Sequence, residues 1–175
     1  LCDLGCGEGY YTSGFQAEEK YGFDMSKEAL KHASKNDPST QYAVASIFRL
    51  PLEDASCDTA VTCFAPFAKD EIERVLTQGG RFFFVSPGPK HLFELKQLIY
   101  DTPYENEMKD LETTLVKEEE YFISNTFHCE KENLISLFKM TPYYHRTRNE
   151  DIDKINHQDG MDITAEFLIR VYQKR

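Results

Sequence analysis

A glycine-rich turn near the start of the chain restricts the fold more than any other feature. It runs Asp3-Leu4-Gly5-Cys6-Gly7-Glu8-Gly9, directly after apolar residues typical of a buried strand. Glycines there permit positive φ angles and let a ligand approach the backbone closely. We expect a helix from about Tyr10 to Glu19, whose first N–H groups would face a carboxylate or phosphate. Strand, glycine turn and helix together predict a ligand-binding loop of an α/β protein.

An acidic residue supports this interpretation of the loop. Asp24 ends a second short strand, in Tyr21-Gly22-Phe23-Asp24-Met25. A carboxylate at that point of an α/β fold binds both hydroxyls of a ribose. The spacing Gly-x-Gly-x-Gly differs from the Gly-x-Gly-x-x-Gly of dinucleotide-binding turns. A dinucleotide turn and a purely structural turn stay open as alternatives.

The rest of the chain alternates strand and helix patterns, which predicts an α/β fold. Residues 101 to 120 are acidic and weakly periodic, and we expect them to lie outside the main sheet. Further strands are expected over residues 1–4, 20–25, 41–46, 59–64, 81–86, 120–129 and 163–172. Further helices are expected over residues 26–35, where Ser26 is the predicted cap, and over residues 69–76, 90–100 and 130–139.

Composition sets the class of protein. The chain has 175 residues, 41% of them hydrophobic, which predicts one domain over residues 1–175 with a real core. It has no run long enough for a membrane span. The five cysteines form no Cys-x-x-Cys pair, so we expect reduced thiols, no metal site and a cytoplasmic location. Because the chain opens in the middle of a strand, we also expect it to be part of a longer protein.

Charge argues against one class of function. Lys and Arg number 20 and Asp and Glu 30, so the net charge is −10. Such a domain does not bind nucleic acid through its overall charge, although it can act on nucleic acid that another part of the protein binds.

The loop, with its acid two residues before the first glycine, resembles that of S-adenosylmethionine-dependent methyltransferases. The resemblance implies an α/β, Rossmann-like seven-strand class I methyltransferase sheet with helices on both faces, and S-adenosylhomocysteine as the product. It places Asp3 near the methionine amino group, the turn at the methionine carboxylate, and Ser46 where many members carry an acid that contacts adenine. The cofactor-binding residues it implies are Asp3, Gly5, Gly7, Glu8, Gly9, Asp24, Met25, Ala45, Ser46, Phe64 and His91.

More particular blocks narrow the resemblance. The chain is similar over its whole length to the bacterial 23S rRNA guanine-N1-methyltransferase family. That family implies a 23S rRNA hairpin as the substrate, an N-terminal zinc-binding module that lies outside this chain, and a homodimer as one option. The blocks are Ser86-Pro87-Gly88-Pro89-Lys90-His91-Leu92, Gly7-Glu8-Gly9-Tyr10-Tyr11-Thr12, Val44-Ala45-Ser46, Arg49-Leu50-Pro51, Ala65-Pro66 and Met140-Thr141-Pro142.

The chemistry requires alignment of the methyl donor with guanine N1 and loss of the N1 proton. His91 and Glu94 follow the fifth expected strand, where ligands bind in open α/β sheets, and are the candidate catalytic residues. A surface histidine and a solvated glutamate are the alternatives. A group of basic and aromatic residues is a candidate RNA surface, or else a solvated loop over core aromatics. Its members are Lys90, Lys96, Tyr143, Tyr144, His145, Arg146 and Arg148.

Three functions therefore compete. The first is methyl transfer from S-adenosylmethionine to N1 of a guanine in a 23S rRNA hairpin. The second is a small-molecule methyltransferase, which needs a closed apolar pocket built by residues 101 to 120. The third is a cofactor-binding fragment without RNA activity.

Overall fold

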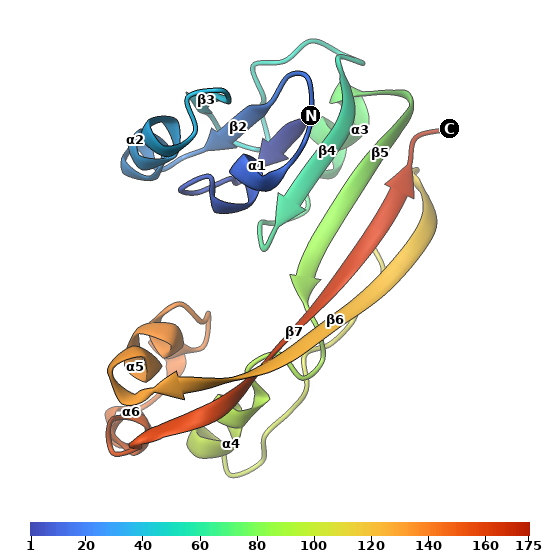
Figure 1. The fold of residues 1–175 in the computed structure, drawn as a ribbon. Coiled ribbons are helices and arrows are strands. Elements are labelled where there is room, and N and C mark those ends of the chain that lie inside the picture. Colours follow the sequence, from blue (N-terminus) through green and yellow to red (C-terminus); the bar gives the residue numbers. More distant parts are fainter. The chain divides into compact units, whose positions relative to one another are not determined.

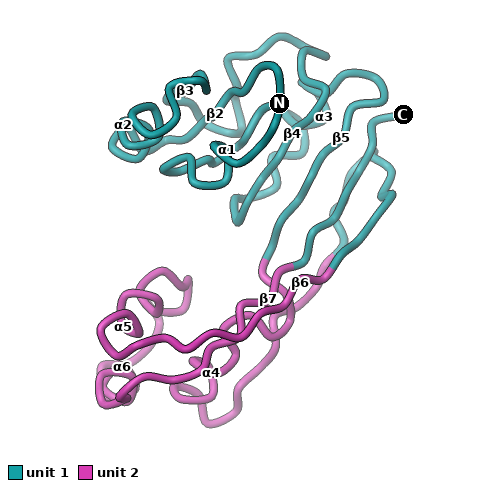
Figure 2. The backbone as a smooth tube through the Cα atoms, in the orientation of Figure 1, with its two compact units in different colours: residues 1–86, 110–121, 168–175 teal, residues 87–109, 122–167 magenta.

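The computed structural model describes residues 1–175, which form two compact units. Unit 1 comprises residues 1–86, 110–121 and 168–175, and unit 2 comprises residues 87–109 and 122–167 (Figure 2). The chain passes between the units several times, so each unit is assembled from distant parts of the sequence.

One seven-stranded sheet runs through the chain in the order β3-β2-β1-β4-β5-β7-β6 (Figure 1). This confirms the predicted α/β class I methyltransferase sheet. The strands are β1 (Cys2–Leu4), β2 (Tyr21–Asp24), β3 (Gln41–Val44), β4 (Cys57–Cys63), β5 (Leu76–Pro87), β6 (Val116–Glu130) and β7 (Gly160–Gln173).

The strands β1 to β5 pair in parallel, and β1 lies between β2 and β4. The strand order therefore reverses direction at β1, since the chain fills one side of β1 before it crosses to the other. In open α/β sheets ligands bind in the crevice at the carboxyl ends of the strands at such a reversal. This topology points to the segments that follow β1 and β4 as the binding region.

Side-chain contacts define the register of β6 against β7. His128 Nδ1 lies 2.8 Å from Asp162 Oδ1, and the hydroxyls of Thr126 and Thr164 are 3.4 Å apart. The residue number falls from 128 to 126 along β6 while it rises from 162 to 164 along β7, so the two strands are antiparallel. β6 begins at Val116, so the expectation that residues 101 to 120 lie outside the sheet is wrong for residues 116–120.

The helices are α1 (Tyr10–Gly14), α2 (Lys27–Asn36), α3 (Lys69–Val75), α4 (Phe93–Ile99), α5 (Lys131–Lys139) and α6 (Asn149–Asn156), with a 3₁₀ turn at Tyr144–Arg146. In unit 1, α1 lies in front of the parallel strands and α3 behind them (Figure 1). Ser26 caps α2 as predicted, because its hydroxyl accepts a hydrogen bond from the Ala29 N–H. The prediction of a helix up to Glu19 is wrong: α1 ends at Gly14, and Phe15 is extended with φ −75° and ψ 139°.

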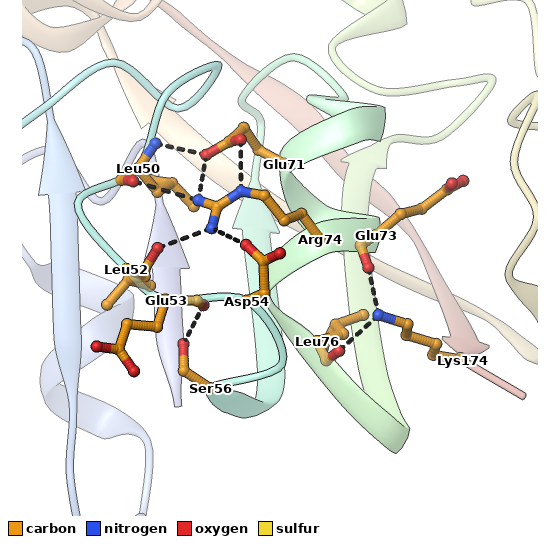
Figure 3. Close-up of polar contacts among 10 residues, drawn as sticks. All are labelled: Leu50, Leu52, Glu53, Asp54, Ser56, Glu71, Glu73, Arg74, Leu76 and Lys174. Atoms are coloured by element: carbon orange, nitrogen blue, oxygen red, sulfur yellow. Dashed lines mark hydrogen bonds and ion pairs between the residues drawn. The ribbon is translucent and has the colours of Figure 1, made fainter.

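Arg74 on α3 holds the loop that follows β3 in place through hydrogen bonds. Its guanidinium donates to both carboxylate oxygens of Glu71 at 2.8 Å, to the carbonyls of Leu50 and Leu52, and to Asp54 (Figure 3). Glu71 in turn accepts from the Leu50 N–H at 2.6 Å. These bonds use the fixed fork of guanidinium donors fully, so the loop and helix are held as one piece.

Lys174 near the end of the chain caps α3. Its ammonium donates to the carbonyls of Glu73 and Leu76, at 2.6 and 2.8 Å (Figure 3). A cation at the carboxyl end of a helix satisfies carbonyls that have no partner within the helix. The backbone of Lys174 also pairs with Gly79 and Gly80, which extends β5 beyond the strand expected over residues 81–86.

The helices and the cysteines show two further features. No helix is both long and apolar enough to cross a membrane. All five cysteines are free thiols, and no cluster of three or more His, Cys, Asp or Glu side chains is placed to hold a metal ion.

Candidate functional site

The glycine loop follows β1 and adopts the conformation that its sequence predicts. Gly5, Gly7 and Gly9 have φ angles of 79°, 54° and 73°, which L side chains rarely adopt. A Cβ atom added to Gly5 would lie 2.6 Å from the Cβ of Ala65, and one added to Gly9 would lie 2.5 Å from the hydroxyl of Tyr42. The loop therefore needs glycine both for its φ angles and for its close contact with the turn after β4.

Most backbone donors of the loop are already used within unit 1. The N–H groups of Gly5 and Cys6 donate to the Phe23 carbonyl, and that of Gly9 donates to the Cys6 carbonyl. The Glu8 N–H, beside the exposed Glu8 side chain, has no protein acceptor, so it remains for a ligand. Since α1 has only five residues, its dipole adds little, contrary to the expectation from a ten-residue helix.

Asp3 is the buried acid of the site. It is 1% exposed; Oδ2 accepts a 2.6 Å hydrogen bond from the Thr12 hydroxyl, and Oδ1 has no protein partner. Burial raises the pKa of Asp3 to about 6, although the Thr12 hydrogen bond acts in the opposite direction. A buried, unpaired carboxylate oxygen is costly, so its presence indicates a site for a cationic or hydrogen-bonding ligand group.

Asp24 connects the loop to the second strand. Its Oδ2 accepts from the Gly7 N–H at 2.9 Å, and its Oδ1 accepts from the Ser26 N–H at 2.8 Å. A carboxylate has about four acceptor positions, so two remain for the hydroxyls of a ribose. Asp24 thus fixes the loop, and its contact with a ribose stays a prediction.

A cavity of about 220 Å³ opens at the loop. It is smaller than the roughly 300–1,000 Å³ of typical small-molecule sites, which suits one end of a cofactor rather than the whole. An unpaired acid oxygen at a glycine turn fits the amino-acid end of S-adenosylmethionine. None of residues 101 to 120 lines this cavity. The lining residues are Asp3, Gly5, Cys6, Gly7, Glu8, Tyr10, Tyr11 and Cys63.

The residues predicted on the adenine side lie after β2 and β3. Met25 is 69% exposed, and the Ala45 N–H donates to the Asp24 carbonyl. The Ser46 hydroxyl accepts from the Phe48 N–H at 3.2 Å and so caps a turn. Phe64, after β4, is 44% exposed. These side chains belong to unit 1 with the loop, and their contact with the cofactor stays a prediction.

His91 and Glu94 belong to unit 2. The His91 ring is half-buried and lies 5.1 Å from the ring of Phe167. Burial lowers the pKa of His91, so its imidazole is neutral at pH 7. The neutral ring is a competent proton acceptor, and its role in catalysis or cofactor binding stays a prediction.

Glu94 is held by a neighbouring strand. Its two carboxylate oxygens accept from the backbone N–H and the hydroxyl of Thr164, at 3.0 and 2.6 Å. Burial raises the pKa of Glu94, but these two bonds outweigh it and leave the pKa below its usual value. The geometry favours a structural carboxylate that ties α4 to β7 over a general base.

The basic and aromatic group is only partly exposed. Lys96 is 1% exposed and donates to Asn106 Oδ1 at 2.7 Å and to the Tyr104 carbonyl. The rings of Tyr143 and Tyr144 pack on Phe138, with centroids 5.8 and 5.4 Å away. Core aromatics under a solvated loop, the second alternative above, describe most of this group.

Sequence analysis missed two aromatic residues of the cavity, Tyr10 and Tyr11. They follow Gly9 directly and are 82% and 45% exposed. Two large exposed aromatic side chains at the end of a ligand loop were the signal, since such side chains are usually buried.

The chain is similar to known methyltransferases in sequence and in fold. Residues 2–84 match the family described as methyltransferase domain. The chain is similar, at 18% identity and a TM-score of 0.66 over 99% of its length and 88% of the other chain, to a solved structure from Anaeromyxobacter dehalogenans provisionally titled a type II methyltransferase. It also resembles an S-adenosylmethionine-dependent methyltransferase from Mesorhizobium loti, at 16% identity and a TM-score of 0.54 over 99% of this chain and 89% of that one. These solved structures show that the chain has the fold of class I methyltransferases, and its first half matches a methyltransferase domain.

Relatives in sequence indicate which methyltransferases the chain resembles. A Bacillus subtilis protein provisionally named 23S rRNA (guanine-N(1)-)-methyltransferase YxjB is 29% identical over 99% of the chain and 66% of its own length. The 23S rRNA (guanine(748)-N(1))-methyltransferase of Streptomyces fradiae is 37% identical over 54% of the chain and 36% of its own length. These relatives confirm the resemblance to the 23S rRNA guanine-N1-methyltransferase family. The chain spans less than two thirds of the length of the curated relatives it matches.

Proposed function

We propose that the protein containing this chain transfers a methyl group from S-adenosylmethionine to N1 of a guanine in a 23S rRNA hairpin. The observation that carries the proposal is the similarity to the Bacillus subtilis relative over 99% of the chain. The unpaired Asp3 oxygen at the glycine loop supports the cofactor. A hairpin suits the chemistry, because a loop base is extruded more easily than a stacked one.

When bound, S-adenosylmethionine supplies a methyl group on a positively charged sulfur, and S-adenosylhomocysteine is the product. Asp3 and the Glu8 N–H bind the ammonium and carboxylate of its methionine part, and Asp24 binds its ribose hydroxyls. Met25, Ala45 and Ser46 contact its adenosine part. Fixing the donor in this way lowers the entropy cost of an in-line transfer.

Guanine N1 carries a proton at neutral pH, which must leave when the new bond to carbon forms. His91 is the better of the two candidate acceptors, because its imidazole is neutral while both Glu94 oxygens are occupied by Thr164. A neutral imidazole takes the N1 proton and becomes the imidazolium.

The acidic domain requires phosphate contacts from elsewhere. With a net charge of −10, this chain attracts no RNA by bulk charge. We therefore assign the phosphate contacts to other parts of the cytoplasmic protein, a zinc-binding module and a second subunit of a homodimer.

The substrate is tested with cells that lack the gene. We expect mass spectrometry of their 23S rRNA to show the loss of one 1-methylguanosine, which the wild-type gene restores. If the deletion strain keeps all its 1-methylguanosine in 23S rRNA, the proposed substrate is wrong.

His91→Ala tests the proton acceptor in the same strain and in single-turnover reactions. We expect methylation slower by about tenfold, from the loss of roughly one hydrogen-bonded contact to the reacting base or cofactor. His145→Ala, an exposed histidine of the same unit, is the control. A His91→Ala protein that methylates at the wild-type rate removes His91 from the site.

Asp24→Asn tests the ribose contact. We expect calorimetry to show S-adenosylhomocysteine binding weaker by about 1–3 kcal/mol, because a charge-assisted pair is lost. Because Asp24 also holds the Gly7 N–H, a 2′-deoxyribose analogue separates the two effects. Loss of the hydroxyl should weaken binding in the wild type and much less in the variant. Equal losses in both proteins would place the ribose elsewhere; Glu18→Gln, an exposed acid outside the cavity, is the control.

A further inference from the structure

The cavity at the glycine loop has a polar side and an aromatic side. Asp3 and the loop backbone provide the polar groups, and Tyr10 and Tyr11 on α1 provide the aromatic ones. The polar side fits the amino-acid end of the cofactor, as argued above. The aromatic side is exposed, although large aromatic side chains are usually buried.

Phe64 extends this aromatic side from the end of the neighbouring strand, β4. Its ring centroid lies 6.1 Å from that of Tyr11, with the planes inclined by 57°, and Tyr10 meets Tyr11 edge-on at 5.2 Å. Phe64 follows Cys63, which lines the same cavity. The three rings thus gather at one place from the ends of β1 and β4, the two strands at the reversal of strand order.

The backbone of Phe64 is in an unusual conformation that keeps the ring there. Its φ of 61° lies in the left-handed region, which is strained for a bulky residue. The Phe64 N–H donates to the Val85 carbonyl at 3.0 Å, which holds the strained residue in place. Such strain concentrates at functional sites, where a side chain has to be presented in one direction.

The neighbouring Phe67 has a different environment. Its ring stacks on Phe82, 5.7 Å away at 26°, and meets Phe84 at 6.4 Å. Phe82 is fully buried, so Phe67 serves the core of unit 1. Of the aromatic residues around the Ala65-Pro66 turn, Phe64 is therefore the one that reaches the cavity region.

We infer that Tyr11 and Phe64 form the platform on which the acceptor base of the RNA stacks, with Tyr10 at its outer edge. The inference rests on the proposed function, because it requires a nucleic-acid base as the methyl acceptor. Enzymes that modify a base extrude it and hold it against aromatic or apolar side chains. The base has to reach the donor at this cavity, which Tyr10 and Tyr11 line, and the Phe64 ring meets that of Tyr11.

A synthetic RNA hairpin with a single 2-aminopurine in its loop tests the platform. The fluorescence of this purine falls when it stacks on an aromatic ring. The hairpin is titrated into the whole protein that contains this chain, in the presence of S-adenosylhomocysteine. Tyr11→Leu and Phe64→Leu remove a ring but keep apolar volume, Tyr11→Phe and Phe64→Tyr keep a ring, and Tyr121→Leu removes an exposed tyrosine outside the cavity.

We expect quenching in the wild type, and hairpin binding weaker by about five- to a hundredfold in Tyr11→Leu and Phe64→Leu, the range for loss of one base–ring stack. The ring-keeping variants and Tyr121→Leu should stay within about twofold of the wild type. Binding of S-adenosylhomocysteine should change less than about twofold in every variant, which also shows that the variants are folded.

Two results would overturn the inference. One is hairpin binding and quenching that do not depend on the rings. The other is weaker binding of the cofactor in the leucine variants. A loss confined to the positively charged S-adenosylmethionine would assign the rings to its sulfonium by a cation–π contact. A loss shared with the neutral S-adenosylhomocysteine would assign them to adenine.

The inferred platform and the proposed rRNA substrate can be refuted independently of each other. Ring-dependent stacking together with unchanged 1-methylguanosine in 23S rRNA of the deletion strain would keep the platform and refute the substrate. Normal rRNA methylation with an unchanged KM for RNA in Tyr11→Leu and Phe64→Leu would keep the substrate and refute the platform.

Discussion

Asp3→Asn should weaken the binding of S-adenosylhomocysteine by about ten- to a hundredfold at pH 7.5. The wild-type carboxylate has one buried oxygen without a protein partner, and the proposed partner is the ammonium of the ligand. Hydrogen bonds to charged groups contribute about 1.5–3 kcal/mol, which corresponds to this loss. Asparagine keeps the volume and an acceptor for the Thr12 hydroxyl, so calorimetry measures the charge.

The pH dependence of the same affinity is a second test of Asp3. Because the pKa of Asp3 in the free protein is about 6, cofactor affinity should fall below pH 6, by up to about tenfold per pH unit. An acid of ordinary pKa would hold its affinity down to about pH 4. Asp3→Asn should show no such step, and a wild-type affinity that is flat between pH 5 and 7 would refute the contact.

Asp3→Asn should also make the ligand-free protein more stable. An acid whose pKa is higher in the folded than in the unfolded state stabilises the fold below its unfolded pKa, and this contribution is lost as the pH rises through the folded pKa. The shift from 3.8 to about 6 corresponds to about 3 kcal/mol as an upper limit. The variant should therefore unfold at higher denaturant concentration above pH 6, with the difference shrinking toward pH 4. A variant that is less stable at pH 8 would show that Asp3 has a structural role.

Local patterns were sufficient for the elements around the loop. Alternating glycines predicted the positive φ angles of Gly5, Gly7 and Gly9, and the Ser26 cap predicted where α2 begins. Asp24 lies at the end of β2 as predicted, and its contact with a ribose stays a prediction. Each of these features depends on residues close together in the sequence.

Contacts between distant segments explain what local patterns missed. β5 continues through Gly79 and Gly80 because both pair with Lys174 at the other end of the chain. The cavity joins Tyr11 after β1 to Cys63 at the end of β4, and no local pattern links those positions. Lys96 resembled a surface charge, but its burial depends on Tyr104 and Asn106 in an irregular segment. The helix α6 was not predicted, and its two buried residues include the charged Asp151, which pairs with Arg148 and Lys154.

Arg74→Met should lower the free energy of unfolding by about 2–3 kcal/mol, the second large effect that we expect. The substitution keeps a long apolar stem but removes every donor that reaches Glu71, Asp54 and the carbonyls of Leu50 and Leu52 (Figure 3). The Leu50 and Leu52 carbonyls lose their hydrogen-bond donor in a partly buried region, and unpaired groups of this kind cost about 1–3 kcal/mol. The guanidinium is 28% exposed, so water replaces part of the loss and keeps the total at a few kcal/mol.

The ion pair between Arg74 and Glu71 allows the cause of this loss of stability to be identified. The hydrogen bond from Arg74 lowers the pKa of Glu71. The wild-type protein should therefore lose stability as the pH falls through this lowered pKa. Arg74→Lys keeps the charge without the fork of donors and should recover less than half of the loss, because one ammonium cannot reach both sides of the loop. Arg81→Met, an exposed arginine of the same unit with one ion pair at 3.6 Å, should cost no more than about 1 kcal/mol. Equal denaturant midpoints for Arg74→Met and Arg81→Met would mean that the loop after β3 is held by its apolar contacts, Leu50 and Leu52, rather than by the guanidinium.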